Sequence, residues 1–317
     1  MKQGDKIFVA GHKGMVGSAI LRNLTQAGFR NLITRTKAEL DLTNQTATRS
    51  FFEAEKPDYV FLVAAKVGGM FANNTFRADF IYENLMIGAN VIQAAFTAGT
   101  TKLLYPGSSC IYPRLATQPI TEESLLTGAL EPTNEPYAIA KIAGIKLIES
   151  FNRQYGSNFI SVMPTNLYGP NDNYHPENSH VLPALIRKFV TAKQNNDPSV
   201  SIRGTGTAIR EFLHVDDLAR ACVFLMGNYS GNEAINIGCG EGISILELAK
   251  LIQKIVGYEG TIQLDTTFGD GAPKKVLNID KIKRLGWAPS ISLETGIRQA
   301  VTEFLEIFSS ELNGVKQ

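Results

Sequence analysis

The segment PYAIAK places Tyr137 and Lys141 four residues apart, in a stretch whose apolar spacing predicts a helix. Residues at positions i and i+4 lie on one face of a helix, so the phenol and the ammonium should be close together. We expect the lysine to favour the phenolate, to lower the pKa of Tyr137 and to make it a proton shuttle for a carbonyl oxygen. Because Tyr-x-x-x-Lys also arises by chance in long helices, the pair needs support from its surroundings.

The segment GSSCIYP supplies a hydroxyl and a thiol at the end of a predicted strand. Ser108 can hold a carbonyl oxygen beside Tyr137, but hydride transfer gives Cys110 no role. A ketone acidifies the C–H bonds on both neighbouring carbons, so a thiolate there could invert a carbon while Ser108 and Tyr137 stabilise the enolate oxygen. If the extended backbone continues, Cys110 lies on the same side as Ser108, where Lys141 or a histidine cation would favour its thiolate. The alternative is a small, buried, apolar cysteine.

The polar segment PNDNYHPENSH contains His180, which is a candidate proton donor for the opposite face of such a carbon. Its alternative role is a solvent-facing or capping residue. His175 and His180 are five residues apart and have no cysteine or second pair nearby, so we expect no metal site. We expect His214 to organise a loop, and Cys222 and Cys239 to be structural.

The segment FVAGHKGMVGSAILRNL places Gly11, Gly14 and Gly17 between a predicted strand and a predicted helix. This G-x-x-G-x-x-G spacing is a variant of the dinucleotide fingerprint, in which glycines let backbone N–H groups approach a pyrophosphate. The alternative is a glycine-rich turn that closes a strand. The strand and helix on either side favour the dinucleotide interpretation.

The next predicted strand, in NLITRTKAELDL, indicates which dinucleotide is bound. An NAD site usually has an acidic residue there for the ribose 2′-hydroxyl, whereas a 2′-phosphate calls for cations. Arg35 and Lys37 occupy this place, so the sequence favours NADP over NAD. The alternative is that both are solvated charges at a strand end. Asp41 could contact the adenine or lie exposed in a loop.

Five apolar runs predict buried strands, and helical patterns separate them; the runs are KIFVAG, NLITRT, YVFLVAA, KLLYPGSS and FISVMPTN. Strands that alternate with helices imply βαβ units. We therefore expect an α/β fold, a Rossmann-type doubly wound parallel sheet.

The pattern changes after Pro164. VLPALIRKFVTA predicts a helix, REFLHVDDLARACVFLM predicts a strand and helix that return to the first lobe, and Ser244 with Glu247 forms a capping box before another helix. A smaller α/β substrate-binding domain should thus be interleaved with the first. The expected division is an NADP-binding domain at 1–167 plus about 211–237, and a nucleotide-sugar-binding domain at about 168–210 plus 238–317.

The composition limits the classes of partner. With 31 basic and 30 acidic side chains and a net charge of +1, the 317-residue chain has no global field that favours nucleic acid or an anionic membrane. Runs such as YVFLVAA are too short to span a bilayer, and the N-terminus has no signal-peptide pattern. Three widely spaced cysteines without C-x-x-C favour a reducing compartment, so we expect a cytoplasmic protein.

Several motifs occur in an order that resembles one family: GHKGMVGS, AAKVGG, GSSCIYP, EPTNEPYAIAKIAG, MPTNLYGP, NSHVLPAL and REFLHVDD. Across essentially the whole chain the sequence is similar to the extended short-chain dehydrogenase/reductases, and among them to those acting on GDP-4-keto-6-deoxy-D-mannose. The resemblance implies epimerisation at C3 and C5, reduction at C4 with NADPH, and a homodimer.

The resemblance also implies roles for individual residues. The family's serine, tyrosine and lysine match Ser108, Tyr137 and Lys141, and its epimerisation acid and base match Cys110 and His180. Residues expected to bind the cofactor are Gly11, His12, Lys13, Gly14, Met15, Val16, Gly17, Arg35, Lys37, Ala38, Glu39, Leu40, Asp41, Leu42, Pro106, Gly107, Ser108, Ser109, Tyr137, Lys141, Pro164, Thr165, Asn166, Leu167 and His180. Residues expected to bind the nucleotide sugar are Ser108, Asn166, Lys188, Arg203, Arg210 and Asp270.

Three positions depart from the family pattern. Lys13 and Lys37 replace arginines, which keeps the charge but removes the bidentate guanidinium fork. Arg203 stands where a related enzyme has tryptophan, so a stacking contact with guanine is replaced by guanidinium stacking or lost.

Other activities on the same fold are alternatives. A 4,6-dehydratase would carry an Asp-Glu pair where this chain has Ser109 and Cys110, and a simple 4-epimerase would hold NAD and need no pair of Cys110 and His180. The alternative from another class is a cofactor-binding module that has lost catalysis. The intact Ser108, Tyr137 and Lys141 argue against that module.

Arg35 and Lys37 lead to a testable preference for NADPH over NADH. Replacing Lys37 with Glu puts a negative charge beside the 2′-phosphate, so Lys37→Glu should weaken this preference. Side-by-side kinetics with the two cofactors measure it. Equal use of NADH and NADPH by the unmodified protein would contradict the assignment.

Overall fold

A computed structural model of the chain describes residues 1–176, 178–267 and 269–314, with the backbone alone at residue 70 and at 309–314. The helices are α1 (Met15–Gln26), α2 (Gln45–Glu55), α3 (Met70–Thr75), α4 (Arg77–Thr97), α5 (Glu135–Tyr155), α6 (Val181–Asn195), α7 (Val215–Asn228), α8 (Ile245–Val256), α9 (Asp280–Arg284) and α10 (Leu293–Gly314), with 3-10 turns η1 (Ser109–Ile111) and η2 (Glu122–Ser124). The strands are β1 (Ile7–Ala10), β2 (Leu32–Ile33), β3 (Tyr59–Leu62), β4 (Lys102–Pro106), β5 (Phe159–Pro164), β6 (Asn166–Tyr168), β7 (Ser199–Arg203), β8 (Ile209–Arg210), β9 (Phe212–His214), β10 (Ile235–Ile237), β11 (Ile243–Ser244), β12 (Thr261–Asp265) and β13 (Lys274–Lys275).

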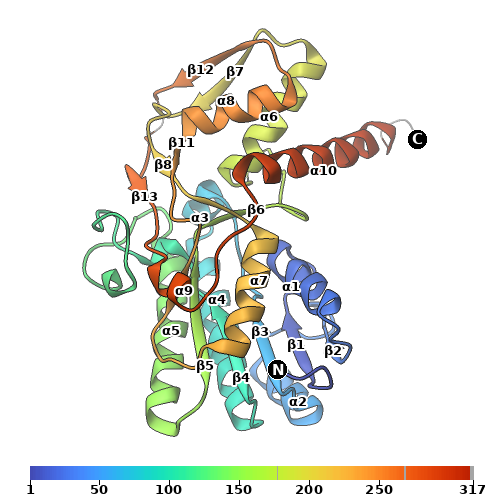
Figure 1. Ribbon diagram of the computed structural model, residues 1–317, viewed down its shortest axis with the longest axis vertical. Helices are drawn as coiled ribbons and strands as arrows, with labels where there is room; N and C mark the ends of the chain where they lie inside the picture. Colours follow the sequence, from blue (N-terminus) through green and yellow to red (C-terminus); the bar gives the residue numbers. More distant parts are fainter. Residues whose placement is uncertain (177, 268, 315–317) are drawn as a thin grey trace.

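A parallel sheet of six strands forms the larger lobe, in the order β10-β5-β4-β3-β1-β2. Helix α4 packs against α5 and α2, while α1 packs against α7, so helices cover both faces (Figure 1). Strands β1, β4 and β5 are buried along their whole length, as expected for strands covered on both sides. The predicted doubly wound α/β fold is confirmed.

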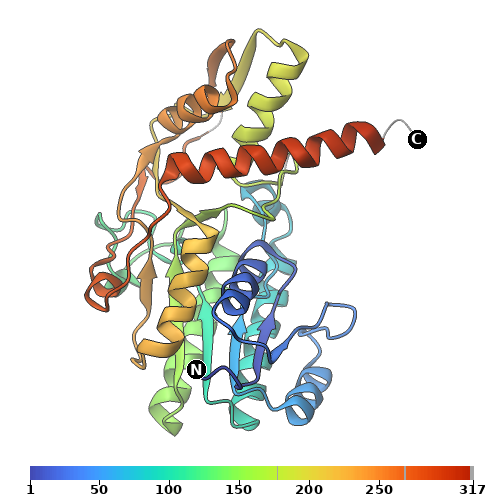
Figure 2. The ribbon, with the colours of Figure 1, turned by 45° about the vertical axis from the view of Figure 1, so that its right-hand side comes forward.

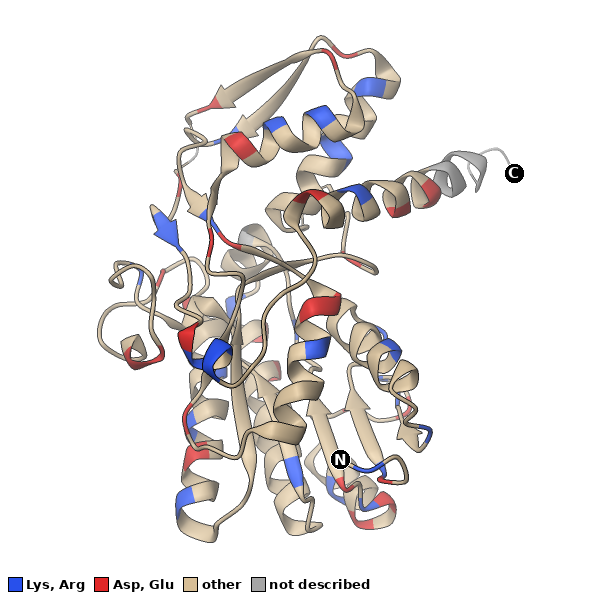
Figure 3. Cartoon of the chain, in the orientation of Figure 1, with Lys and Arg blue, Asp and Glu red and all other residues tan. Residues whose placement is uncertain are grey.

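A second, smaller core lies above this sheet. It is built from the apolar faces of α6, α8 and α10, and β7 pairs in parallel with β12 at its outer edge (Figure 1). Figure 2 shows α10 lying across the molecule beneath α6 and α8. The predicted capping box of Ser244 and Glu247 begins α8, with the Ser244 side chain accepting a hydrogen bond from the Glu247 N–H. Figure 3 shows basic and acidic residues on helices of both lobes.

Two local predictions need correction. The strand predicted in NLITRT is only two residues long, Leu32–Ile33, and its side chains are half-buried. The extended segment expected through Cys110 instead turns into η1 directly after Ser108, whose hydroxyl accepts a hydrogen bond from the Cys110 N–H at 3.4 Å. A serine that caps its own turn overrides the strand pattern there.

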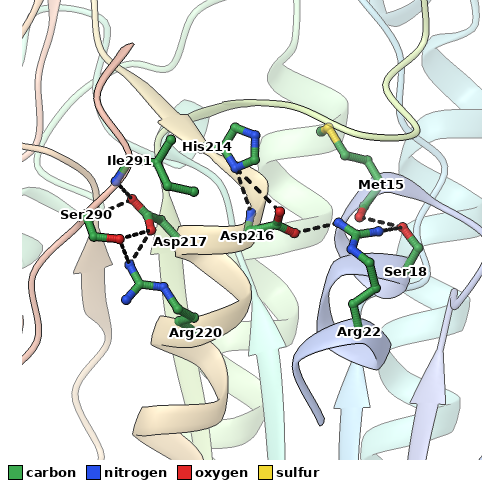
Figure 4. A network of polar contacts seen from close by, with 9 residues as sticks. All are labelled: Met15, Ser18, Arg22, His214, Asp216, Asp217, Arg220, Ser290 and Ile291. Carbon is green, nitrogen blue, oxygen red and sulfur yellow. Dashed lines mark hydrogen bonds and ion pairs between the residues drawn. The ribbon is translucent and has the colours of Figure 1, made fainter. Parts of the chain in front are cut away.

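The first turn of α7 joins distant segments (Figure 4). Asp217 is fully buried and accepts hydrogen bonds from the N–H groups of Ser290 and Ile291, each at 2.9 Å. Asp216 forms an ion pair with Arg22 of α1 at 2.5 Å. His214 caps α7 by accepting from the Asp216 N–H at 3.3 Å, so it organises the returning chain as expected.

The fully buried carboxylate of Glu211 connects three segments of backbone. One oxygen accepts from the N–H groups of Cys239 and Gly240, both at 2.6 Å, and the other accepts from the Leu277 N–H at 2.8 Å. Burial raises the pKa of Glu211, and these donors oppose the shift.

No helix among the described residues is long and apolar enough to cross a membrane.

The Glu211 contacts predict a loss of stability in Glu211→Gln. A glutamine keeps one acceptor but points an amide N–H₂ at one of the backbone donors, and an unsatisfied buried donor costs about 1–3 kcal/mol. Denaturant unfolding should show this loss, while Glu259→Gln, a change of an exposed carboxylate, should leave the midpoint unchanged. Equal midpoints for the two variants would contradict the role assigned to Glu211.

Candidate active site

A cavity of about 760 Å³ lies at the carboxyl ends of strands β1, β3, β4 and β5. Ligands of open α/β sheets bind at this edge, where the order of the strands reverses. The expected cofactor residues that line it are Gly11, Gly14, Met15, Val16, Gly17, Arg35, Lys37, Leu40, Asp41, Leu42, Pro106, Gly107, Ser108, Ser109, Tyr137, Lys141, Pro164, Thr165, Asn166, Leu167 and His180. Four expected residues are not among the lining residues: His12, Lys13, Ala38 and Glu39.

The glycine loop has the shape that a pyrophosphate needs. Gly11 has φ +89°, and a Cβ there would lie 2.7 Å from the backbone nitrogen of Ala64. A Cβ on Gly17 would lie 2.1 Å from the Gly11 carbonyl oxygen, so α1 packs directly against the turn. Helix α1 has no acidic residue in its first turn and no side-chain cap, which leaves its N-terminal N–H groups to an anion. These residues therefore fit a dinucleotide.

Cations and carboxylates line the far end of the cavity. Arg35 pairs with Glu55 at 2.8 Å, and Lys37 pairs with Glu83 at 3.3 Å. Lys66, which the sequence did not indicate, also pairs with Glu83, at 2.6 Å, and the pKa of Glu83 is lowered chiefly by this hydrogen bond. A phosphate bound at this end would lie near three cations, Arg35, Lys37 and Lys66, each of which already forms an ion pair with a carboxylate.

Lining residues that sequence reasoning missed come mainly from the segment after β3: Val63, Ala64, Ala65, Lys66 and Val67. The motif AAKVGG was a signal for them. Its second glycine, Gly69, donates its N–H to the Asn178 carbonyl at 3.1 Å, and a Cβ there would lie 2.8 Å from the Ser179 carbonyl oxygen. The motif thus brings the segment before His180 close to the cavity.

Helix α5 places Tyr137 and Lys141 beside the end of β4. Lys141 is buried, donates a hydrogen bond to the Pro106 carbonyl at 2.9 Å, and lies 4.5 Å from the ring centroid of Tyr105 and 5.7 Å from that of Tyr137. Burial lowers the pKa of Lys141 to about 8. The expected proximity of phenol and ammonium is therefore present.

The expected lowering of the Tyr137 pKa is wrong for this structure. Burial raises the pKa of the phenol well above its usual value, and the negative charges of ionised Cys110 and Tyr105 would raise it further. Desolvation is the largest cause of this shift, and the nearby Lys141 is itself buried and donates its hydrogen bond to Pro106. At neutral pH Tyr137 is a protonated phenol that can donate a proton.

Cys110 lies in η1, buried behind the lining residues Ser108 and Ser109. Burial raises the pKa of its thiol, so desolvation prevails over the expected effect of Lys141. The opposing influences are first the charge of Lys275, then a hydrogen bond with Ser108, then the charge of Lys141. Lys275 had no assigned role in the sequence.

His180 occupies the N-cap position of α6 and faces the cavity. Its imidazole is accessible from the cavity but surrounded by protein, and this desolvation lowers its pKa. The side chain is therefore mostly neutral at neutral pH.

The residues expected to hold the nucleotide sugar divide into two groups. Ser108 and Asn166 line the cavity, whereas the others lie in the smaller lobe, outside the lining residues. There Arg210 donates to the Asp270 carbonyl at 3.1 Å, Lys188 donates to the Ser201 carbonyl at 2.8 Å, and the charge of Arg203 acts on Lys188.

Comparison with known proteins assigns the chain to a family. Residues 7–238 match the NAD dependent epimerase/dehydratase family. The chain belongs to this family. GDP-L-fucose synthase 1 of Arabidopsis thaliana is 58% identical over 95% of this chain and 93% of the relative, and GDP-L-fucose synthase of Escherichia coli (strain K12) is 53% identical over 95% and 97%.

A solved structure is similar over almost the full length of the chain. It is a GDP-L-fucose synthetase from Naegleria fowleri bound to NADP, with a TM-score of 0.90 and 30% identity, over 98% of this chain and 96% of that one. The predicted membership of the extended short-chain dehydrogenase/reductases is confirmed.

The glycine loop predicts that Gly17→Ala weakens dinucleotide binding, because the new methyl group meets the Gly11 carbonyl and displaces α1 from the turn. We expect the dissociation constant for NADPH to rise more than about tenfold, measured by fluorescence titration. Gly227→Ala, at a helix position with open space around it, is the matched control. Unchanged NADPH affinity in Gly17→Ala would contradict the cofactor site.

Proposed function

We propose that the protein is a GDP-L-fucose synthase, which epimerises GDP-4-keto-6-deoxy-D-mannose at C3 and C5 and then reduces C4 with NADPH. The observation that carries the proposal is the turn after β4: Ser108 lines a cavity suited to a dinucleotide together with Tyr137 and Lys141, and Cys110 is buried in the same turn. A 4-ketone gives a role both to the thiol of Cys110 and to the hydroxyl groups of Ser108 and Tyr137, because the ketone oxygen takes up negative charge in epimerisation and in reduction. The two relatives compared above bear this name.

The cofactor residues have distinct tasks in this proposal. The N–H groups around Gly11, Gly14 and Gly17 hold the pyrophosphate, and Arg35 with Lys37 holds the 2′-phosphate. NADP in the N. fowleri structure supports the choice of dinucleotide. When bound, the cofactor supplies the hydride for C4.

Reduction requires a proton on the C4 oxygen. Tyr137 donates it from its protonated phenol, and the raised pKa of this group keeps the proton available. Ser108 donates a hydrogen bond to the same oxygen. Lys141 stabilises the phenolate that remains, since its Nζ lies 5.7 Å from the tyrosine ring centroid.

Epimerisation uses the other two groups. The Cys110 thiolate takes the proton from C3 or C5: an S–H bond forms, the C–H bond breaks, and its electron pair moves into an enolate with charge on the C4 oxygen. A protonated His180 returns a proton to the opposite face of the carbon. Because desolvation lowers the pKa of His180, this donation should slow as the pH rises through the range where the imidazole loses its proton.

The remaining assignments complete the proposal. Lys188, Arg203, Arg210 and Asp270 bind the GDP portion, while Ser108 and Asn166 contact the sugar. Residues 1–167 plus about 211–237 form the NADP-binding domain, and about 168–210 plus 238–317 form the nucleotide-sugar-binding domain. The protein acts as a cytoplasmic homodimer; the exposed Tyr82 of α4 and Ile139 of α5, 62% and 41% accessible, support an interface on these helices.

Separation of the two activities tests the proposal. Cys110→Ser replaces the thiol with a much weaker acid, so the variant should lose epimerisation, keep reduction and accumulate GDP-6-deoxy-mannose or its C4 epimer. Solvent deuterium should enter C3 and C5 of the keto sugar with the unmodified protein but not with Cys110→Ser. His180→Asn should block product epimerisation and can retain exchange on the face of Cys110.

Two further variants serve as comparisons for this experiment. Tyr137→Phe should slow reduction by roughly 10²- to 10⁴-fold while slow exchange persists. Cys239→Ser, a change of a half-buried thiol outside the cavity lining, should behave as the unmodified protein. Deuterium incorporation by Cys110→Ser at the unmodified rate would refute the role of the thiol.

A further inference from the structure

The backbone of Lys66 fixes the segment after β3 to helix α4. The Lys66 N–H donates a hydrogen bond to the side-chain oxygen of Asn84 at 3.0 Å, and the Asn84 amide donates back to the Lys66 carbonyl at 3.0 Å. The same amide donates to the Phe80 carbonyl at 2.7 Å, and Asn84 is buried. Helix α4 packs against β3 in the larger lobe (Figure 1). These hydrogen bonds therefore fix the place of Lys66 along this helix.

The residue before Asn84 receives the side chain of Lys66. The Lys66 ammonium lies 2.6 Å from one carboxylate oxygen of Glu83, and the Lys37 ammonium lies 3.3 Å from the other. All three side chains line the cavity. That of Lys37 is 72% exposed, whereas those of Lys66 and Glu83 are 30% and 25% exposed. Glu83 thus bridges two lysines, and the lysine that the chain holds more closely is Lys66.

Two further carboxylates lie near these lysines. Asp41 accepts hydrogen bonds from the Thr43 side chain at 2.8 Å and from the Thr43 N–H at 3.0 Å. Asp79 lies 3.3 Å from the Lys66 ammonium, but it is 57% exposed and is not among the lining residues of the cavity. The hydrogen bond from Lys66 lowers the pKa of Glu83, so this carboxyl group is ionised at neutral pH.

An ionised carboxylate on this wall opposes the binding of a phosphate. Glu83 repels a 2′-phosphate and competes with it for Lys37 unless a cation compensates the carboxylate. The two lysines and Glu83 together carry a charge of +1. Without the Lys66 ammonium this charge would be zero, because Lys37 and Glu83 would compensate each other. Lys66 thus determines whether the wall attracts a phosphate.

We propose that Lys66 determines the selectivity for NADP: its ammonium compensates the Glu83 carboxylate, so that Lys37 is available to the 2′-phosphate of the cofactor. This inference rests on the proposed function, which assigns the 2′-phosphate to Arg35 and Lys37, and it deepens that assignment by naming the pair that prepares Lys37. Lys66 is a positioning residue, because it acts through Glu83.

Binding of two fragments of the cofactor tests the inference without any turnover. Adenosine 2′,5′-bisphosphate and adenosine 5′-monophosphate differ only in the 2′-phosphate, and calorimetric titration of the full-length protein gives both dissociation constants. Lys66→Met should weaken binding of the bisphosphate about two- to fivefold, as expected for one exposed charge pair, and leave the monophosphate unchanged. Lys146→Met is the matched control, because it removes an exposed lysine that pairs with Glu149 outside the cavity lining.

A change of the carboxylate separates the positioning role from a direct contact. Glu83→Gln removes the competing charge and should bind the bisphosphate more tightly than the parent protein. In the double variant Lys66→Met/Glu83→Gln, Lys37 again leaves a charge of +1, so the affinity for the bisphosphate should return to that of the parent. The differences among the variants should shrink at high salt, because mobile ions screen exposed charges.

The outcomes separate this inference from the proposed function. A parent protein that binds the bisphosphate no more tightly than the monophosphate would refute the proposed site for the 2′-phosphate. A preference of the parent that persists in full in Lys66→Met overturns the inference alone. A double variant that binds the bisphosphate as weakly as Lys66→Met also overturns it, since Lys66 would then contact the phosphate itself.

Discussion

The buried carboxylate of Glu211 is the constraint on which the arrangement of the two lobes depends. It stands between β8 and β9 and accepts three backbone hydrogen bonds, two from the segment just after β10 and one from the segment after β13. A desolvated carboxylate is stable only when such donors surround it, so the three segments are obliged to meet at one point. That point joins the parallel sheet to the smaller lobe, and it fixes both Arg210 and the strand of Lys275.

Desolvation also sets the chemistry of the site. Burial raises the pKa of Tyr137 and of Cys110, and it lowers the pKa of Lys141, of Lys275 and of His180. Each group is thereby pushed towards its neutral form. The neutral phenol of Tyr137 suits the donation of a proton to an alkoxide. The proposed epimerisation instead uses the charged forms of Cys110 and His180, which this burial makes less abundant at neutral pH.

The cavity is assembled from segments that are far apart in the chain. The glycine loop supplies one wall, the segment after β3 a second, and the loop before α6 brings His180 to the same space. The approach of Gly69 to the carbonyls of Asn178 and Ser179 shows how tightly these segments meet, because a side chain at Gly69 would collide with them. Gly69 thus allows these two segments to approach each other closely, apart from any contact that the segments make with a ligand.

The sequence by itself determined the elements whose signals are local. Alternating apolar runs and helical spacing predicted the doubly wound sheet, the spacing of Gly11, Gly14 and Gly17 predicted the dinucleotide turn, and the spacing of Tyr137 and Lys141 placed them on one face of α5. Each signal works because backbone geometry relates residues that are close in the chain.

Only the tertiary structure decided the rest, because burial and long-range contact depend on every segment at once. Ser108 caps a turn that the strand pattern did not foresee, and desolvation reverses the expected shift in the pKa of Tyr137. The role of Glu211 arises from partners 28, 29 and 66 residues away in the chain, so no local pattern could reveal it.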